Sequence, residues 1–167
     1  MPRLSMSSIR SMLLLVCASA ASAQPETIQL GMSVPLTGNA SDIGQSYKNG
    51  IELAINQLNK EGGVQGAKVQ LLVKDDQYEP ELTVQNTRQF IIENKVLALF
   101  AYVGTPTSAA ILPLLQHYQV PYIAPFTGAS LLRQPEYNFI YHLRAGYDEE
   151  TQSQVDYLRT KPDTKVG

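Results

Sequence analysis

The sequence predicts an α/β fold in which helices cover both faces of an open parallel sheet. Two observations lead to this class. Short apolar runs alternate with segments of helical periodicity from residue 27 to the end of the chain, and such alternation is typical of βαβ units around a parallel sheet. The length of 167 residues fits one domain and a short appendage, since a domain has about 150 residues.

The first βαβ unit carries the clearest signals. Residues 27–34 form a mostly apolar run that predicts a buried strand, and the turn residues Pro35, Gly38 and Gly44 follow it. A helix is expected over residues 45–60, with glycines directly after it as a stop signal. Its apolar residues recur at helical spacing: Tyr47, Ile51, Ala54, Ile55 and Leu58.

The alternation continues through the rest of the chain. Further strands are expected at residues 68–74, 96–101, 121–124 and 138–143, and the start of another at 165–167. Helices are expected at residues 80–94, 111–118 and 148–159. Pro80 suits the first turn of its helix, whereas Pro113 is expected to bend the second one. In the last helix, Val155 and Leu158 are predicted to face inward.

The first 23 residues have the three parts of a secretory signal peptide. Arg3 and Arg10 give a basic start, an apolar stretch follows at residues 12–16, and small residues end the segment at Ala23. The apolar part is far shorter than the roughly 20 residues that a membrane-spanning helix needs. We therefore expect cleavage after Ala23 and a soluble periplasmic protein of residues 24–167.

Composition excludes several classes of protein. Charged residues make up 17% of the chain and apolar residues 44%, which excludes a disordered protein. The net charge is −2, and no basic run is present to neutralise a row of phosphates, so nucleic acid is not an expected partner. The only cysteine is Cys17, in the leader, so the mature chain forms no disulfide. Lipid attachment at Cys17 is the weaker alternative, because Val16 precedes it where lipoprotein signals usually have glycine or alanine.

Ligands of open parallel sheets bind beyond the carboxyl ends of the strands. This rule selects five loops: residues 35–43, 75–79, 102–107, 125–129 and 144–148. In the third loop, Thr105 and Thr107 place hydroxyls and backbone N–H groups at a helix amino end, which favours a carboxylate or another anion. Thr107 is equally consistent with a simple helix cap. The fourth loop adds an aromatic ring, a hydroxyl and a glycine near the same crevice.

Other polar residues have structural interpretations. Asp75 and Asp76 are expected to form a turn and cap a helix, because adjacent side chains at a strand end point in different directions and no third metal ligand is near. His117 and His142 have no Asp, Cys or His at ligand spacing, so neither is a metal or catalytic candidate. Arg144 either anchors the fifth loop or meets a ligand.

Common enzyme signatures are missing from the sequence. It has no G-x-G-x-x-G after the first strand, no Walker lysine, no G-x-S-x-G and no H-E-x-x-H. Nothing in these residues supports catalysis, a cofactor or a metal, although a single lobe could lack half of an active site.

Several segments together resemble the type I periplasmic substrate-binding proteins of ABC transporters, in particular the leucine/isoleucine/valine-binding branch. They are PLTG at residues 35–38, NGIELA at 49–54, GGVQG at 62–66, DDQYEP at 75–80, GTPTS at 104–108 and VPYIAPFTGA at 120–129. The resemblance covers nearly all of the mature chain. It implies that residues 24–167 are the N-terminal ligand-binding lobe of a two-lobed protein, and that the chain is truncated where a second lobe would begin.

The resemblance also implies ligand-binding residues. The carboxylate of the ligand is assigned to Thr105, and its ammonium group to Phe126, Thr127 and Gly128. Tyr147, in the fifth loop, is a further candidate.

The chain departs from the branched-chain pattern in three respects. Ile43 stands where those relatives place an aromatic side chain against the ligand, and Gly128 stands where a threonine is expected. Relatives carry a disulfide at the positions that match Tyr78 and Gly104. This chain lacks that disulfide, in agreement with the absence of cysteine from its mature part.

The function implied by the resemblance is capture of an amino acid or related small carboxylate and its delivery to the membrane subunits of an ABC permease, by a monomer. An extracytoplasmic sensory domain with the same fold is the alternative. If each lobe supplied half of a micromolar affinity, the isolated lobe would bind roughly a thousandfold more weakly.

Overall fold

The computed structural model describes residues 27–161. Its centre is a parallel sheet of five strands in the order β2-β1-β3-β4-β5. The predicted leader and the predicted strand at residues 165–167 lie outside the described residues. The strands are β1 (Ile28–Val34), β2 (Val69–Asp75), β3 (Ala98–Phe100), β4 (Tyr122–Ile123) and β5 (Ile140–Tyr141).

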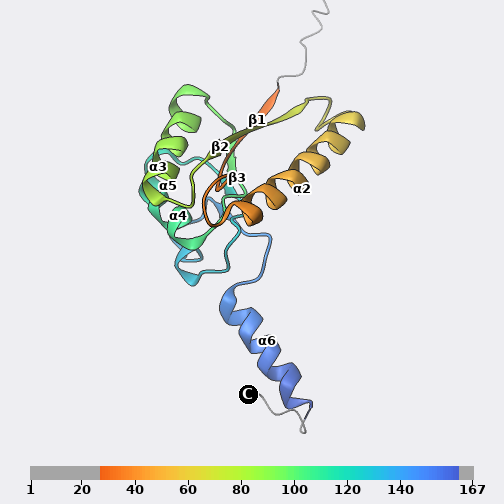
Figure 1. Cartoon of the computed structure of the whole chain (residues 1–167), viewed down its shortest axis with the longest axis vertical. Helices are drawn as coiled ribbons and strands as arrows, with labels where there is room; N and C mark the ends of the chain where they lie inside the picture. The colour runs from red at the N-terminus through yellow and green to blue at the C-terminus, as the bar shows by residue number, and fades with distance from the viewer. Residues whose placement is uncertain (1–26, 162–167) are drawn as a thin grey trace, which may run out of the picture.

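Helices cover both faces of this sheet, as expected (Figure 1). One face carries α2 (Ser41–Lys60), and the other carries α3 (Pro80–Arg88), α4 (Thr105–Ala110) and α5 (Leu112–Tyr118). A π-helical turn, η1 (Gln89–Glu93), continues α3, and a short 3-10 helix, η2 (Ser130–Leu132), follows β4. The described chain ends with α6 (Tyr147–Arg159).

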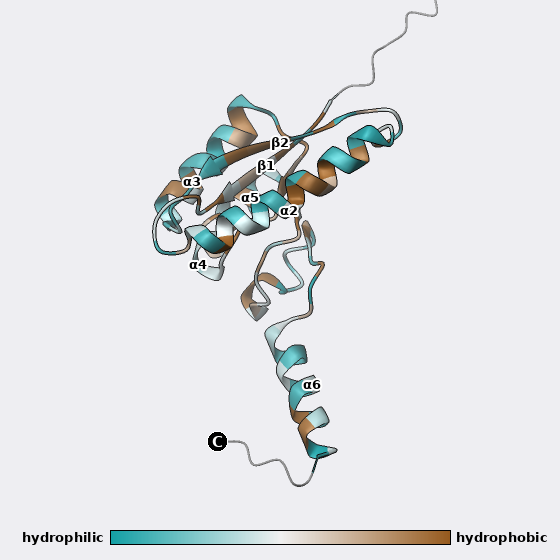
Figure 2. Ribbon diagram, turned by 45° about the vertical axis from the view of Figure 1, so that its right-hand side comes forward, coloured by the Kyte–Doolittle hydropathy of each residue, from teal (hydrophilic) through white to brown (hydrophobic). Residues whose placement is uncertain are grey.

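Two apolar clusters fill the space between the sheet and its helices. The cluster on the α2 side contains Met32, Val34, Ala101 and Val103. The larger cluster, on the side of α3 to α5, includes the following buried residues: Phe90, Leu99, Tyr102, Ile111, Leu115 and Tyr122. Figure 2 shows hydrophobic colouring along β2 and alternating hydrophobic and hydrophilic segments along α2.

Close approach at one glycine explains how the larger cluster reaches the sheet. A Cβ atom on Gly31 of β1 would lie 2.7 Å from Cγ of Phe90. The fully buried Phe90 side chain therefore packs directly against the strand backbone, where any side chain on residue 31 would displace it.

Two predicted helices have different boundaries in the structure. The helix expected from residue 45 begins at Ser41. It therefore includes Gly44, which the sequence pattern had predicted to lie in a turn. The helix expected at residues 111–118 is α5, which begins at Leu112, and a separate short helix, α4, precedes it and meets it at Ile111. Pro113 lies in the first turn of α5, where its missing N–H needs no partner, so the proline starts a new helix rather than bending a continuous one.

The prediction for the last helix is wrong about its packing. α6 contains no buried residue, and Val155 is 38% exposed. The helix extends away from the sheet and its covering helices (Figure 1). Val155 and Leu158 therefore do not face the core formed by residues 27–146. Within residues 27–161, none of the helices has the length and apolar character needed to cross a bilayer.

Candidate functional site

The candidate site lies at the carboxyl edge of the sheet. In the order β2-β1-β3-β4-β5, the chain moves from β1 to one side for β2 and then to the other side for β3. The loops after β1 and β3 consequently diverge and leave a crevice at this edge, which is where doubly wound sheets bind ligands. Ile43, in the first turn of α2, and Thr105, the first residue of α4, follow these two strands.

Three hydroxyl groups meet at this edge. The Oγ1 atoms of Thr105 and Thr127 are 2.7 Å apart, and Oγ1 of Thr127 lies 3.4 Å from the hydroxyl of Tyr147. The hydrogen bond with Thr127 and the backbone of Gly128 are the two largest causes that lower the pKa of Tyr147 from its usual value. We call Thr105, Thr127 and Tyr147 the hydroxyl cluster. It joins three residues that the sequence placed in three separate loops.

The backbone at the ends of β3 and β4 brings the two threonines together. Ala101 and Ala124 both have a positive φ, of 59° and 57°, and turn the chain directly after each strand. Val103 and Phe126 then pair as a parallel bridge, with the N–H of Phe126 donating to the carbonyl of Tyr102 at 2.8 Å. The segments that carry Thr105 and Thr127 consequently lie side by side.

Thr107 is not the cap of α4. Gly104 holds the N-cap position, and the buried hydroxyl of Thr107 donates to the carbonyls of Val103, at 2.6 Å, and Gly104, at 3.0 Å. The predicted anion-attracting helix end belongs to a helix of only six residues, so the helix dipole there is small. The hydroxyls of the cluster are the side-chain donors beside this helix end.

Gly128 makes room for Tyr147. A Cβ atom on Gly128 would lie 2.7 Å from Cδ1 of Tyr147, and the N–H of Tyr147 donates to the carbonyl of Gly128 at 2.8 Å. The threonine expected at residue 128 would clash with the tyrosine ring in this arrangement.

An apolar wall borders the hydroxyl cluster. Ile43, Tyr47 and Phe126 line one shallow depression together, and the rings of Tyr47 and Phe126 have their centroids 4.7 Å apart. Burial raises the pKa of Tyr47. Helical spacing predicted that Tyr47 belongs to the apolar face of its helix, and it did not predict the contact with Phe126. The available signal was a tyrosine at the loop end of an otherwise aliphatic stripe.

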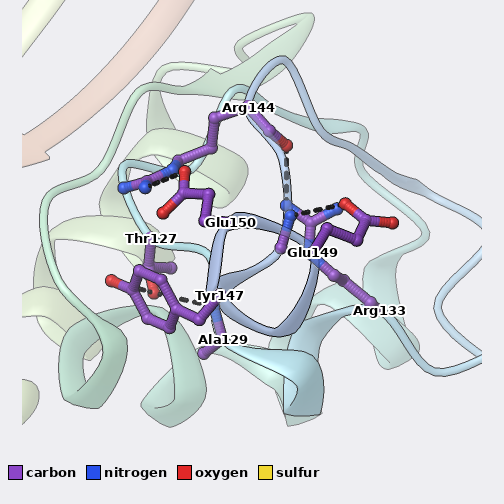
Figure 3. Close-up of polar contacts among 8 residues, drawn as sticks. Thr127, Ala129, Arg133, Arg144, Tyr147, Glu149 and Glu150 are labelled. Atoms are coloured by element: carbon purple, nitrogen blue, oxygen red, sulfur yellow. Dashed lines mark hydrogen bonds and ion pairs between the residues drawn. The ribbon is translucent and has the colours of Figure 1, made fainter. Parts of the chain in front are cut away.

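The segment before α6 is tied to the loop after β4 (Figure 3). The guanidinium of Arg133 donates to the carbonyl of Arg144 at 2.8 Å, and the hydroxyl of Ser130 donates to the carboxylate of Asp148 at 2.7 Å. Arg144 forms an ion pair with Glu150, and its guanidinium lies 5.1 Å from the ring centroid of Tyr147. These contacts fix Tyr147 beside Thr127, and Arg144 beside Tyr147.

Asp75 and Asp76 form a turn, as predicted, but neither caps α3, whose N-cap is Glu79. Asp75 accepts the backbone N–H groups of Leu36, at 2.7 Å, and Gln77, at 3.0 Å. Asp76 is fully buried, and its carboxylate accepts hydrogen bonds from Ser33, Tyr78 and Thr83.

The pKa values of Asp75 and Asp76 are shifted in opposite directions from the usual value of an aspartate. Burial is the largest cause for both carboxyls and by itself raises the pKa. For Asp76 it prevails, so its pKa is raised, whereas for Asp75 the hydrogen bonds from Thr37 and its neighbours outweigh burial and lower the pKa. Among the described residues, no three His, Cys, Asp or Glu side chains gather as metal ligands.

The histidines are structural here, as expected. The Nε2 atom of His142 lies 3.1 Å from the carbonyl of Leu132, and burial lowers the pKa of its imidazole. The ring of His117 packs edge-on against Tyr118, with centroids 4.6 Å apart. Neither histidine is among the residues of the hydroxyl cluster or the apolar wall.

Comparison with known proteins identifies relatives of one kind. The model of the periplasmic binding protein family matches residues 27–167. A Leu/Ile/Val-binding protein homolog of Brucella melitensis is 30% identical over 149 residues, which are 88% of this chain and 40% of that protein. The match covers the N-terminal part of such relatives, so the chain spans about two fifths of their length.

Solved structures agree with this result. A possible leucine/isoleucine/valine-binding protein from Rhodopirellula baltica has a TM-score of 0.76 and 35% identity, over 85% of this chain and 38% of that one. A periplasmic substrate-binding protein from Ralstonia solanacearum has a TM-score of 0.72 and 29% identity, over 80% and 38% of the two chains. The relatives are binding proteins, in agreement with the expectation of a binding protein rather than an enzyme.

Proposed function

We propose a solute-capturing role for this chain, which belongs to the periplasmic binding protein family. In this proposal it works in the periplasm as the solute-binding component of an ABC transporter. It takes up an amino acid or a related small carboxylate and presents it, as a monomer, to the membrane subunits of a permease. Residues 1–23 are the cleaved leader, and residues 24–167 are the N-terminal lobe of a two-lobed binding protein.

The hydroxyl cluster is the observation that carries the proposal. A carboxylate oxygen accepts hydrogen bonds from two or three donors, and a hydroxyl group rotates to donate wherever an acceptor lies. The hydroxyl oxygen of Thr127 lies 2.7 Å from that of Thr105 and 3.4 Å from that of Tyr147. In the proposal, they turn from one another toward the carboxylate of the solute.

The remaining candidate residues surround that carboxylate. The carbonyl of Gly128 accepts the N–H of Tyr147 and keeps a second lone pair for the ammonium group of an amino acid. Phe126 is 41% exposed and Ile43 is 54% exposed, so both offer apolar surface to the rest of the solute. An aliphatic Ile43 in place of an aromatic ring leaves more space on this side of the crevice.

Titration followed by NMR tests the proposal. We would express the full sequence with ¹⁵N labelling and titrate the recovered protein with leucine, valine, glutamine and glutamate, up to tens of millimolar. Such concentrations suit a single lobe, whose affinity is expected in the millimolar range. The proposal predicts saturable shifts centred on the amides of Thr105, Thr127, Gly128 and Tyr147. Shifts that avoid these residues, or no shift with any of the four amino acids, contradict it.

A further inference from the structure

Arg144 is a cationic side chain at the border of the site, with no part in the hydroxyl cluster. It lines a depression of about 240 Å³ together with Tyr47, Phe126 and Leu143. Two of these residues, Tyr47 and Phe126, also form the apolar wall that includes Ile43. Arg144 therefore faces the same surface as the proposed solute, from the side of β5.

The position of the guanidinium is held by neighbours. It lies over the ring of Tyr147, with 5.1 Å between its Cζ atom and the ring centroid, and it pairs with Glu150 through one Nη atom. Figure 3 shows the guanidinium on the same side of the segment as Thr127 and Tyr147. A guanidinium carries five N–H donors, so pairing with Glu150 leaves donors for a second acceptor.

Glu150 does not cancel the charge of Arg144 for a ligand. The two side chains are 32% and 36% exposed, and ion pairs that water reaches to this degree contribute little free energy. Among the residues that line the two depressions, Asp42 is the acidic one, and it lines the depression with Ile43 rather than the one with Arg144. A ligand carboxylate near Arg144 would thus meet a guanidinium that Glu150 and Tyr147 keep in a defined position. The ion pair with Glu150 is weak enough to leave the guanidinium available to the ligand.

We propose that Arg144 is a specificity-determining residue that binds a second acidic group of the solute, so that this protein prefers an acidic amino acid or a small dicarboxylate to a neutral branched-chain amino acid. The inference rests on the proposed function, because the hydroxyl cluster must hold the first carboxylate. A planar guanidinium suits this task, since it matches both oxygens of a carboxylate. Leucine, isoleucine and valine, for which the relatives are named, have neutral side chains. The proposal therefore gives this chain a different ligand preference from that of those relatives.

Glutamate and glutamine form the matched ligand pair for the test, because they differ only in the acidic group. In the NMR titration, we expect the labelled full-sequence protein to bind glutamate about fivefold more tightly than glutamine, as befits a partly exposed ion pair. Arg144→Gln should abolish the difference, and Arg144→Lys should retain part of it. Arg159→Gln is the matched control, since Arg159 pairs with Asp156 at the other end of α6, and it should keep the full preference.

Two results would overturn the inference and leave the proposed function standing. One is equal affinity for glutamate and glutamine, or binding of leucine alone, with shifts centred on Thr105 and Thr127. The other is a glutamate preference that survives in Arg144→Gln. If none of the amino acids shifts the hydroxyl cluster, the proposed function fails and the inference fails with it. The spectra of the variants report directly whether each remains folded.

Discussion

The ring of Tyr78 lies directly on the backbone of Gly104. A Cβ atom on Gly104 would be 2.4 Å from Cε2 and 2.7 Å from the hydroxyl oxygen of Tyr78. Gly104 also has a φ of +105°, which residues with a side chain rarely adopt. The contact joins the loop after β2 to the loop that carries Thr105, at the two positions where the branched-chain-binding relatives are expected to have a disulfide.

Gly104→Ala should destabilise the protein, because it adds both a clash and backbone strain. We expect a loss of about 1 to 3 kcal/mol in the free energy of unfolding, measured by urea denaturation. Gly50→Ala is the matched control. Gly50 lies exposed in α2, where a Cβ atom would meet nothing within 4 Å, and alanine there should stabilise by up to about 1 kcal/mol. Equal effects of the two substitutions would refute the packing described for Tyr78.

Thr105→Ala should weaken solute binding by about 1 to 3 kcal/mol, because it leaves a carboxylate oxygen without a donor. Dissociation constants from NMR titrations of wild type and variant give the difference directly. Thr160→Ala serves as the control, since Thr160 is an exposed threonine just past α6. Unchanged affinity in Thr105→Ala would reduce Thr105 to a residue that only shapes the loop.

The two aspartates at the end of β2 should have opposite effects on stability as pH changes. The pKa of Asp76 is raised in the folded protein, so the folded state binds more protons than the unfolded state between the two pKa values. The contribution of Asp76 to stability therefore falls as pH rises through this interval, which begins at about pH 4. The pKa of Asp75 is lowered, so its contribution is present above about pH 4 and is lost as pH falls below it.

Urea denaturation at a series of pH values tests both signs. Asp76→Asn should flatten the decline in stability above about pH 4, and Asp75→Asn should flatten the decline below it. The slopes are the informative quantity, because an asparagine also changes the hydrogen bonds of the turn. A steeper decline above pH 4 in Asp76→Asn would show that burial does not raise the pKa of that carboxyl.

Substitutions on α6 should leave the stability of the sheet unchanged. Val155→Ala removes methyl groups from an exposed position, so the free energy of unfolding should change by less than about 0.5 kcal/mol. Leu115→Ala, in the buried face of α5, should cost about 2 to 5 kcal/mol. A cost above 2 kcal/mol for Val155→Ala would mean that α6 packs against the rest of the chain.

Periodicity predicted the strands, the helices and the parallel α/β class, because each depends on local spacing of apolar residues. Periodicity failed at positions whose structure depends on contacts with residues far away in the sequence. Gly44 looked like a turn residue, yet it lies in α2, where the residue must be glycine because a Cβ atom would be 1.8 Å from the carbonyl oxygen of Pro35. Val155 has helical spacing in a helix that has nothing to pack on among residues 27–146, and spacing alone does not report that.

The candidate site was predictable to the level of loops. The rule for strand ends selected the segments that hold Thr105, Thr127 and Tyr147, and the structure brings these three hydroxyls together. The contacts between Gly128 and Tyr147, and between Tyr47 and Phe126, link residues far apart in the chain. No local pattern encodes such pairs, since they depend on how separate loops fold against one another.

The most direct test of the proposed site compares an amino acid with its own carboxamide. For the amino acid that produces the largest shifts in the NMR titration, the wild-type protein should bind the carboxamide about tenfold or more weakly, because the amide loses the charge that strengthens hydrogen bonds to the hydroxyl cluster. In the Thr105→Ala variant the difference should shrink. Equal affinity of the wild-type protein for the amino acid and its carboxamide would contradict the assignment of the hydroxyl cluster as the carboxylate site.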